Sequence, residues 1–320
     1  MVLPREFILN SLDLWKGARS LDPFAEQLSR RPPEGELKTV GGPFGRLLNI
    51  PVQIPVVRTE LDPPFYMFTR DPRSEGWGGV SFELHRRGKF EDAIAERISQ
   101  EVSDICRSSG GLFIDVGTNI GFFTMLAASW GCRVLGFEAN SALHELVRNS
   151  AMLNGFHHVT VVPHGAGPKR ERVLVNNKLT CPGCSSLTSA DDPDAMEIML
   201  VDISSYVEER PVFMKIDIDG YEIGALEGAL DFIRKYKLPR GYVELNPWWW
   251  HRGRGVTLER GQQLLQELNS IGYEFSHTNG SRYSFESLIS DVKSTIVDSP
   301  YEGVDTNLFF SLPTTYQGMA

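Results

Sequence analysis

Apolar residues recur with two different periods along the chain, one typical of helices and one typical of strands. Segments of the two kinds alternate from residue 90 onward. Between residues 90 and 105 the apolar residues recur at helical spacing, which predicts an amphipathic helix. Short apolar runs over 112–116, 133–137 and 159–163 then predict strands, and the segments 119–130 and 141–154 between them predict helices. Such alternation predicts stacked β-α-β units and a mostly parallel sheet.

This succession of helices and strands is interrupted over residues 169–209, which we interpret as an insertion with two short apolar alternations, 172–175 and 197–201. It then resumes. The later predicted elements are a strand over 212–217, a helix after it, a strand over 241–245, a helix over 257–271, and a closing pair of strands at 272–275 and 307–310. The sequence therefore predicts a doubly wound, Rossmann-like α/β fold with a mostly parallel sheet and an antiparallel C-terminal strand pair.

Proline changes this picture at the N-terminal end. Ten of the 19 prolines fall within the first 80 residues, where they exclude a long helix or a central strand. The same region also holds enough apolar side chains to pack against another part of the protein. We expect residues 1–84 to form an irregular appendage packed on a main domain at 85–320.

Charge narrows the function classes. The chain has 320 residues, with 32 basic and 41 acidic side chains and a net charge of -9. This balance argues against sequence-independent attraction to nucleic acid or to an anionic membrane. No signal-peptide pattern and no apolar window long enough to span a bilayer occurs. We expect a cytoplasmic protein that binds neither nucleic acid nor membrane.

The four cysteines are too few for a disulfide framework. We expect Cys106 and Cys132 to be reduced thiols in the core. Cys181 and Cys184 have the spacing of a redox or zinc site, but no second such pair accompanies them. A plain tight turn is the favoured interpretation, since Pro-Gly lies between them.

The turn after the first strand of the main domain is the first candidate site. In open parallel sheets, ligands bind beyond the carboxyl ends of the strands. Asp115 precedes the turn, and Gly117 permits a tight turn with close backbone approach. Asn119 is predicted to cap a helix beginning at Ile120, and Gly121 to let that helix pack near the sheet.

The positions of acidic residues indicate which nucleotide such a turn could bind. The dinucleotide pattern Gly-x-Gly-x-x-Gly is absent, and Asp115 would repel a pyrophosphate. It suits instead the sulfonium and ammonium groups of S-adenosylmethionine, although it could simply brace its own turn. Glu138 ends the next strand, where an acid reaches ribose hydroxyls, although alone it would be an ordinary loop acid.

Charged residues also lie in and directly after the predicted fourth strand. Alternation places Lys215, Asp217 and Asp219 on one side of that strand. Buried charges are costly unless paired, so these residues are expected to serve a ligand at the strand end. The alternative is a Lys215–Asp217 pair that satisfies itself.

These motifs together resemble the FkbM family of S-adenosylmethionine-dependent methyltransferases. The matching segments are DVGTNIG at 115–121, FEAN at 137–140 and KIDIDGYE at 215–222, and the resemblance spans about residues 85–310. A further match, GKFE, lies at 88–91. The chain departs from the family pattern at Thr118, Ala139 and Asp219, which stand where Ala, Pro and Glu are usual. The resemblance implies methyl transfer to oxygen, commonly on sugar hydroxyls or natural-product alcohols.

Roles follow for the residues near the strand ends. We expect Asp217 or Asp219 to accept the hydroxyl proton, Lys215 to fix the neighbouring carboxylate, and Glu222 to orient the acceptor. The two aspartates could alternatively hold Mg²⁺. The residues expected to hold the cofactor are Asp115, Gly117, Thr118, Asn119, Gly121, Glu138, Ala139, His164 and Gly165.

The segment after the fifth strand is expected to wall the acceptor pocket through Glu244, Asn246, Trp248 and Trp249. A hydrophobic lid over the appendage is the alternative for the tryptophans. Two other functions stay open for the whole chain. One is a module that binds S-adenosylmethionine without catalysis, and the other, less favoured, is a nicotinamide-dependent oxidoreductase.

Overall fold

A central eight-stranded sheet organises the chain, as a computed structural model shows for residues 55–75, 79–176, 186–218, 220–245, 247–250, 257–298 and 307–313. From edge to edge its strands are β13 (Arg282–Tyr283), β12 (Glu274–Ser276), β14 (Asn307–Ser311), β11 (Arg240–Glu244), β10 (Phe213–Ile216), β3 (Leu112–Val116), β4 (Arg133–Phe137) and β5 (Val159–Val162).

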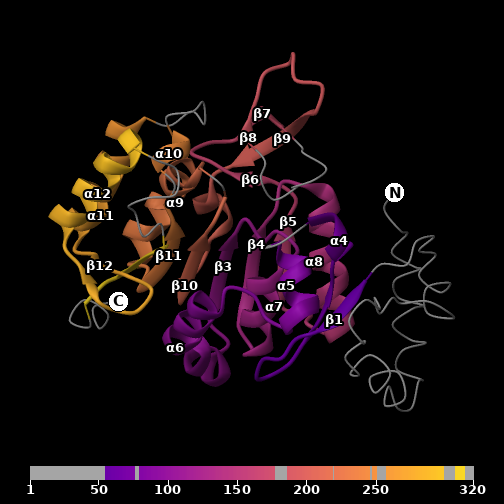
Figure 1. Cartoon of the computed structure of the whole chain (residues 1–320). Helices are drawn as coiled ribbons and strands as arrows, with labels where there is room; N and C mark the ends of the chain where they lie inside the picture. Colours follow the sequence, from indigo (N-terminus) through magenta and orange to yellow (C-terminus); the bar gives the residue numbers. More distant parts are fainter. Residues whose placement is uncertain are drawn as a thin grey trace, which may run out of the picture.

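The strand directions confirm the predicted fold class. From β11 through β5 all neighbouring strands are parallel. The late strand β14 is antiparallel and lies between β11 and β12. In chain order, β3, β4 and β5 build one half of the sheet, and the chain then returns to place β10 on the other side of β3 (Figure 1). The switch point of the sheet therefore lies between β3 and β10.

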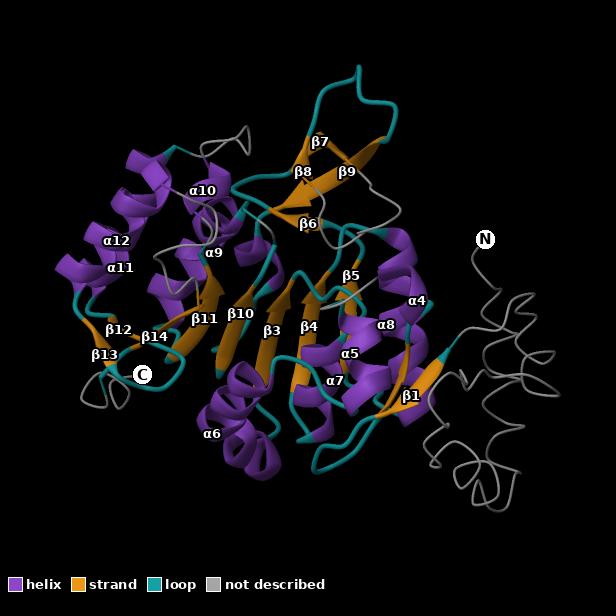
Figure 2. Cartoon of the chain, viewed as in Figure 1, coloured by secondary structure: helices purple, strands orange, loops and turns teal. Residues whose placement is uncertain are grey.

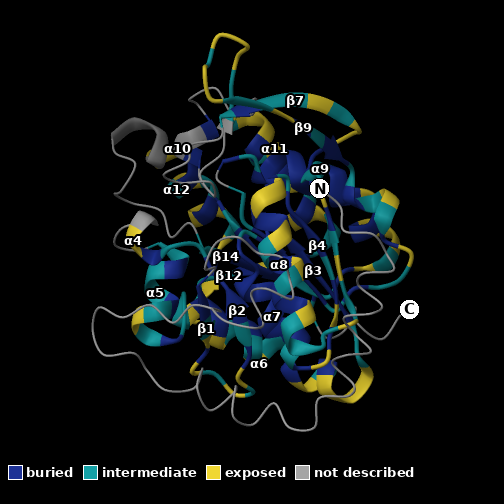
Figure 3. Cartoon of the chain, turned by 90° about the vertical axis from the view of Figure 1, so that its right-hand side faces the viewer, coloured by how far each residue is buried: buried dark blue, intermediate teal, exposed yellow. Residues whose placement is uncertain are grey.

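Helices cover both faces of this sheet (Figure 2). One face packs against α9 (Glu222–Tyr236), α11 (Leu258–Ile271) and α12 (Phe285–Asp298), and the other against α6 (Asp92–Ser109), α7 (Phe122–Ser129) and α8 (Ser141–Asn154). Successive strand residues serve opposite faces, so Ile114 joins the first cluster and Phe113 the second. Phe113 stacks on Phe213 of the adjacent strand, with ring centroids 5.4 Å apart. Figure 3 shows the buried sheet between the two helical layers.

The described part of the N-terminal region packs on α8. Strands β1 (Val56–Arg58) and β2 (Tyr66–Phe68) form an antiparallel pair, followed by α4 (Pro72–Glu75) and α5 (Val80–Arg87). The backbone amide of Tyr66 donates to Asn154 Oδ1 at 2.8 Å, and that of Phe68 donates to Ser150 Oγ at 2.9 Å. Residues 1–54, the larger part of the expected appendage, lie outside the described residues.

A separate four-stranded sheet takes three of its strands from the predicted insertion. It consists of β6 (Gly165–Ala166), β9 (Ala195–Val201), β7 (Glu171–Asn176) and β8 (Ser186–Leu187), followed by the short helix η1 (Ile203–Tyr206). Both predicted apolar alternations are strands of this sheet. It lies beyond the carboxyl ends of the parallel strands (Figure 2). Cys181 and Cys184 lie outside the described residues.

The cysteine prediction was wrong for the other pair. Cys106, in the last turn of α6, is joined by a disulfide to Cys132, which precedes β4, and the two Cα atoms are 4.6 Å apart. Both residues are buried, as expected. The error arose because their positions in the chain do not reveal that the end of α6 lies beside the start of β4.

Candidate functional site

The glycine turn lies at the switch point and is held between two strands. Gly117 has a φ of 82°, and a Cβ there would lie 2.0 Å from the carbonyl oxygen of Asp217, the residue that follows β10. On the other side, the amides of Gly117 and Thr118 donate to the carbonyl of Phe137 at 3.0 and 3.1 Å. The close approach that requires glycine at 117 is therefore made to the backbone after β10.

Two details of the turn differ from the sequence interpretation. Helix α7 begins at Phe122, with Gly121 at its N-cap, and Asn119 lies in the turn at φ 52°. Asn119 does not cap the helix; its Oδ1 accepts from the amide of Ile120 at 2.8 Å. A Cβ at Gly121 would lie 3.0 Å from Val147 of α8, so this glycine permits close packing on a helix and not on the sheet. The helix does not start earlier because Asn119 and Gly121, with φ of 52° and 93°, have left-handed backbone conformations.

Glu138 binds the turn from the neighbouring strand. Its Oε2 accepts from the amide of Asn119 and its Oε1 from the amide of Asn140, each at 2.8 Å. The side chain is buried, and burial raises its pKa to about 7 despite these donors. Each carboxylate oxygen can accept a second hydrogen bond, so the geometry leaves acceptor capacity for a diol.

Asp115 and Thr118 present buried polar atoms that need partners. Thr124 Oγ1 donates to Asp115 Oδ2 at 2.6 Å. Asp115 Oδ1 and Thr118 Oγ1 are buried and form no hydrogen bond within the described part of the chain. Burial raises the pKa of Asp115, although Lys215 and Thr124 oppose the effect. A ligand with an ammonium group and hydroxyls fits this arrangement, because it supplies the missing donors.

Lys215 is a buried cation at the same point. Its side chain is 2% exposed, its Nζ donates to Asp217 Oδ2 at 2.9 Å, and Nζ lies 4.7 Å from the centre of the Phe123 ring. Burial favours the neutral amine, but the carboxylates of Asp217, Asp115 and Glu91 hold the pKa of Lys215 above its ordinary value. Lys215 and Asp217 therefore lie on one side of the strand end as an ion pair.

Asp217 is the more accessible member of this pair. Its side chain is 26% exposed. Burial favours the neutral acid, but the charge of Lys215 and a hydrogen bond with Glu244 hold the pKa of Asp217 below its ordinary value. Glu244 ends β11, so the structure brings together a predicted catalytic residue and a predicted substrate residue.

Glu222 is turned into the protein. Its side chain is buried, its Oε1 accepts from the amide of Gly220, and its Oε2 accepts from Trp250 Nε1 at 3.2 Å. Trp250 ends the short helix α10 (Pro247–Trp250) and is itself buried. This arrangement holds the loop after β10, in place of the direct contact with an acceptor that the sequence favoured.

Ala139 and Gly165 meet at the start of the small sheet. A Cβ at Gly165 would lie 3.6 Å from Ala139 Cβ and 2.8 Å from Leu200 Cδ2. His164 precedes Gly165 and is partly exposed. Asp219, Asn246 and the side chains of Trp248 and Trp249 lie outside the described residues.

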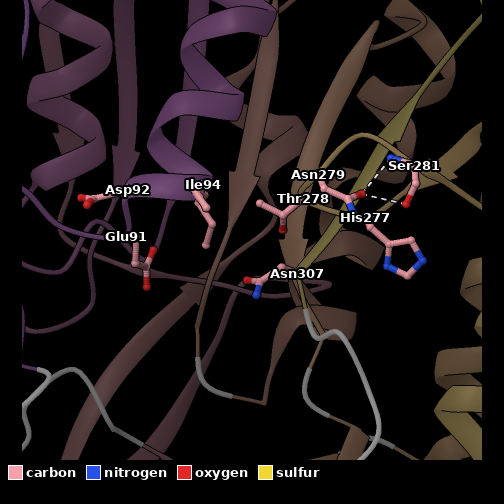
Figure 4. Close-up of a pocket in the computed structure, with 9 residues that line it drawn as sticks. Glu91, Asp92, Ile94, His277, Thr278, Asn279, Ser281 and Asn307 are labelled. Carbon is pink, nitrogen blue, oxygen red and sulfur yellow. Dashed lines mark hydrogen bonds between the residues drawn. The ribbon is translucent and has the colours of Figure 1, made fainter.

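Sequence reasoning missed Glu91. Together with Asp92 and Ile94 at the start of α6, Glu91 lines a pocket of about 640 Å³. The turn between β12 and β13 and residue Asn307 complete the lining (Figure 4). The match of GKFE to the family pattern was the available signal, but it lies ahead of the predicted strands.

The described residues contain neither a membrane-spanning helix nor a metal-binding cluster. None of their helices is long and apolar enough to cross a membrane. They include no group of three or more His, Cys, Asp or Glu side chains arranged to hold a metal ion. Asp219, on which the Mg²⁺ alternative depends, is not among them.

Comparisons with solved structures give partial matches. Methyltransferase FkbM from Methylobacillus flagellatus KT is 20% identical, with a TM-score of 0.38, and the match covers 63% of this chain but only 43% of that chain. A TehB-like SAM-dependent methyltransferase from Corynebacterium glutamicum is 14% identical, with a TM-score of 0.37, covering 76% of this chain and 100% of that chain. A putative methyltransferase from Streptococcus mutans in complex with SAH is 11% identical, with a TM-score of 0.37, covering 65% and 94%.

The comparison with protein families is more informative. No curated protein matches the chain. The model of the methyltransferase FkbM domain matches residues 115–275, from the acid before the glycine turn to the strand beside β14. This segment contains the turn, Glu138, the Lys215–Asp217 pair and Glu244, and it makes up half of the chain. The chain belongs to the FkbM methyltransferase family.

Proposed function

We propose that this methyltransferase uses S-adenosylmethionine to methylate a hydroxyl group of a sugar, a glycan or a natural product. The observation that carries the proposal is the pairing of buried, incompletely bonded acceptors at the switch point with an ionised carboxylate beside them. Asp115 Oδ1 and Thr118 Oγ1 offer polar atoms to a cofactor. Asp217, kept ionised by Lys215, lies at the end of the adjacent strand.

The cofactor residues have distinct tasks in this proposal. Asp115 attracts the positively charged end of S-adenosylmethionine, and Glu138 accepts from the ribose hydroxyls. Thr118, Asn119 and the two glycines, Gly117 and Gly121, shape the turn. Farther along, Ala139, His164 and Gly165 lie where adenine would be held. The bound cofactor supplies an electrophilic methyl group, and the protein supplies position and charge.

The acceptor side is formed at the ends of β10 and β11. Lys215 neutralises the buried charge of Asp217, and Asp217 is hydrogen-bonded to Glu244. We propose that the Asp217 carboxylate and the Glu244 carboxyl group orient an acceptor hydroxyl and that Asn246, Trp248 and Trp249 extend the wall. The sequence prediction that Asp217 or Asp219 takes the proton stays a prediction.

A binding and transfer experiment tests the proposal. Calorimetry should show that S-adenosylhomocysteine binds and NAD does not, and mass spectrometry with labelled cofactor should detect a methyl group added to one of a panel of sugars, glycosides and polyketide alcohols. Binding without any transfer would favour the non-catalytic module, and preference for NAD would favour the oxidoreductase.

Asp217→Asn separates the two halves of the site. We expect this variant to lose turnover by at least about 100-fold while it binds S-adenosylhomocysteine normally, because the change removes the carboxylate that orients the acceptor hydroxyl and leaves Asp115 and Glu138 in place. Turnover close to that of the wild type would contradict the role of Asp217.

A further inference from the structure

The pocket at the start of α6 lies at the same edge of the sheet as the proposed acceptor site. It is lined by Glu91 and Asp92 on one side and by the β12–β13 turn on the other, with Asn307 between them (Figure 4). Asn307 pairs with Glu244 in the β11–β14 register. The pocket therefore adjoins the strand whose end carries a proposed substrate residue.

Three buried polar atoms of pocket residues form no hydrogen bond within the described part of the chain. They are Glu91 Oε2, Asp92 Oδ1 and Thr278 Oγ1. Buried polar atoms are normally bonded, so such a group in one pocket indicates a ligand that completes them. Carboxylates need donors, whereas a threonine hydroxyl both donates and accepts. Several hydroxyl groups on one molecule meet both needs, which an ammonium group does not.

The backbone of Glu91 is held in an unusual conformation. Glu91 occupies the N-cap of α6 with φ 44° and ψ 54°, in the left-handed region, and its side chain does not cap the helix. A non-glycine residue in this region costs about 1–3 kcal/mol and is found disproportionately at functional sites. The carboxylate of this N-cap residue is therefore directed away from the helix end.

Side-chain contacts hold the residues on both sides of Thr278 in the opposite wall of the pocket. The ring of His277 stacks on Tyr283 with centroids 4.2 Å apart. Asn279 Oδ1 accepts from both the amide and the hydroxyl of Ser281, at 2.9 and 2.7 Å. Thr278 therefore lies between two residues whose side chains have partners, whereas its own hydroxyl forms no hydrogen bond within the described part of the chain.

Charges around Glu91 suit it for proton transfer. Burial raises the pKa of Glu91 to about 7, with a further increase from Asp217 and an opposing effect from Lys215. The other titratable groups of the pocket are Asp92, which is paired with Arg87 at 2.7 Å, and His277. A general base works best when its pKa lies near the working pH. Asp217 is a weaker base, because Lys215 and Glu244 lower its pKa.

We propose that this pocket binds a polyhydroxylated acceptor, such as a sugar or glycoside, and that Glu91 is the catalytic base for the hydroxyl that is methylated. This inference rests on the proposed function. The acceptor oxygen forms a bond to the methyl carbon as the carbon–sulfur bond breaks, and the electron pair of that bond stays on sulfur. The hydroxyl proton passes to Glu91 Oε2, and the neutral carboxyl group later returns it to water.

Glu91→Gln tests the catalytic role, with Glu96→Gln, an exposed acid on the same helix, as its control. With an acceptor from the panel above, Glu91→Gln should lower kcat by at least about 100-fold and remove the loss of rate that the wild type shows below pH 7. Binding of S-adenosylhomocysteine should not change. Thr278→Val should instead raise KM and keep the pH profile of kcat.

A second measurement does not depend on turnover. In protein with ¹³C-labelled glutamate, one carboxyl signal, identified by its loss in Glu91→Gln, should titrate near pH 7 and shift when a methyl glycoside is added. A kcat for Glu91→Gln similar to that of Glu96→Gln would overturn the proposal. So would a Glu91 signal that titrates in the ordinary glutamate range.

Failure of the proposed function would look different. In that case the wild type itself would transfer no methyl group to any hydroxylated probe. The carboxyl signal of Glu91 would then test the pocket assignment. If no methyl glycoside shifts that signal, the assignment is wrong as well.

Discussion

Lys215 Nζ lies 2.9 Å from Asp217 Oδ2, and both residues are held at the end of β10. The same ammonium is 4.0 Å from Asp115 Oδ1, on the strand where Asp115 is directly in register with Lys215. One buried cation therefore serves both a proposed cofactor residue and a proposed acceptor residue. Its loss should affect the fold as well as the site.

Lys215→Met should reduce the free energy of unfolding by about 3–5 kcal/mol, because it leaves the buried carboxylates without their cation. Urea denaturation measures this change. Lys169→Met, which removes an exposed lysine, is the control and should stay within about 0.5 kcal/mol of the wild type. Equal effects of the two changes would show that the buried pair is not important for stability.

Gly117→Ala and Gly155→Ala form a matched pair for the glycine turn. Both residues have positive φ, but a Cβ at 155 would meet nothing within 4 Å, whereas one at 117 would overlap the Asp217 carbonyl. Gly155→Ala should cost about 1 kcal/mol from conformation alone. The cost of Gly117→Ala should be greater by at least about 2 kcal/mol, with weaker binding of S-adenosylhomocysteine. Similar stabilities of the two variants would contradict the close approach of the glycine turn to the backbone after β10.

Much of the sheet could be predicted from local signals. The bounds of β3, β4 and α8 match the predictions because each is marked locally, the strands by apolar runs and α8 by Asn140 at its start and Gly155 at its end. The start of α7 could not be predicted in the same way. Asn119 is a good capping residue in general, but here its backbone amide is used by Glu138, nineteen positions away.

The missing parts of the site depend on contacts between distant segments. Glu91 precedes the sheet in sequence and reaches the pocket only because α6 lies along β11 and β14, where Glu101 binds Arg240. Helix α12 was also not predicted.

The charged end of β10 was predicted from alternation. The burial of Glu222 was not, because it depends on Trp250, which lies in a segment with three consecutive tryptophans and no periodic signal.

Glu138 and Glu91 should make stability depend on pH in a defined direction. Their pKa values are raised from 4.5 to about 7 in the folded chain. Their contribution to stability is therefore fully present below pH 4.5 and is lost as the pH rises through 7. Thermal melts between pH 5 and 8 should show this fall.

Glu91→Gln should reduce the fall in stability between pH 5 and 8, whereas Glu145→Gln, at an exposed position of α8, should leave it unchanged. Glu138→Gln should also reduce it, but with lower stability throughout, because a side-chain amide group cannot accept from both Asn119 and Asn140. A pH profile that is the same in all variants would contradict the raised pKa values.

Removal of the Cys106–Cys132 disulfide should lower the free energy of unfolding by about 2–4 kcal/mol. Cys132→Ser tests this, and a reductant should destabilise the wild type but not lower the melting temperature of the variant further. Disulfides are typical of oxidising compartments. Alkylation of freshly isolated protein, followed by mass spectrometry, would show whether the bond is present in the cell.

The position of β14 has a consequence for biosynthesis. This strand is made after β11 and β12 but lies between them, so β12 cannot join the sheet until residues 307–311 have been synthesised. The parallel half of the sheet, with the glycine turn, can assemble on the ribosome well before that point. The pocket beside Glu91 cannot, because Asn307 and the β12–β13 turn arrive with the last strand. A nascent chain should therefore bind the cofactor before it can bind an acceptor.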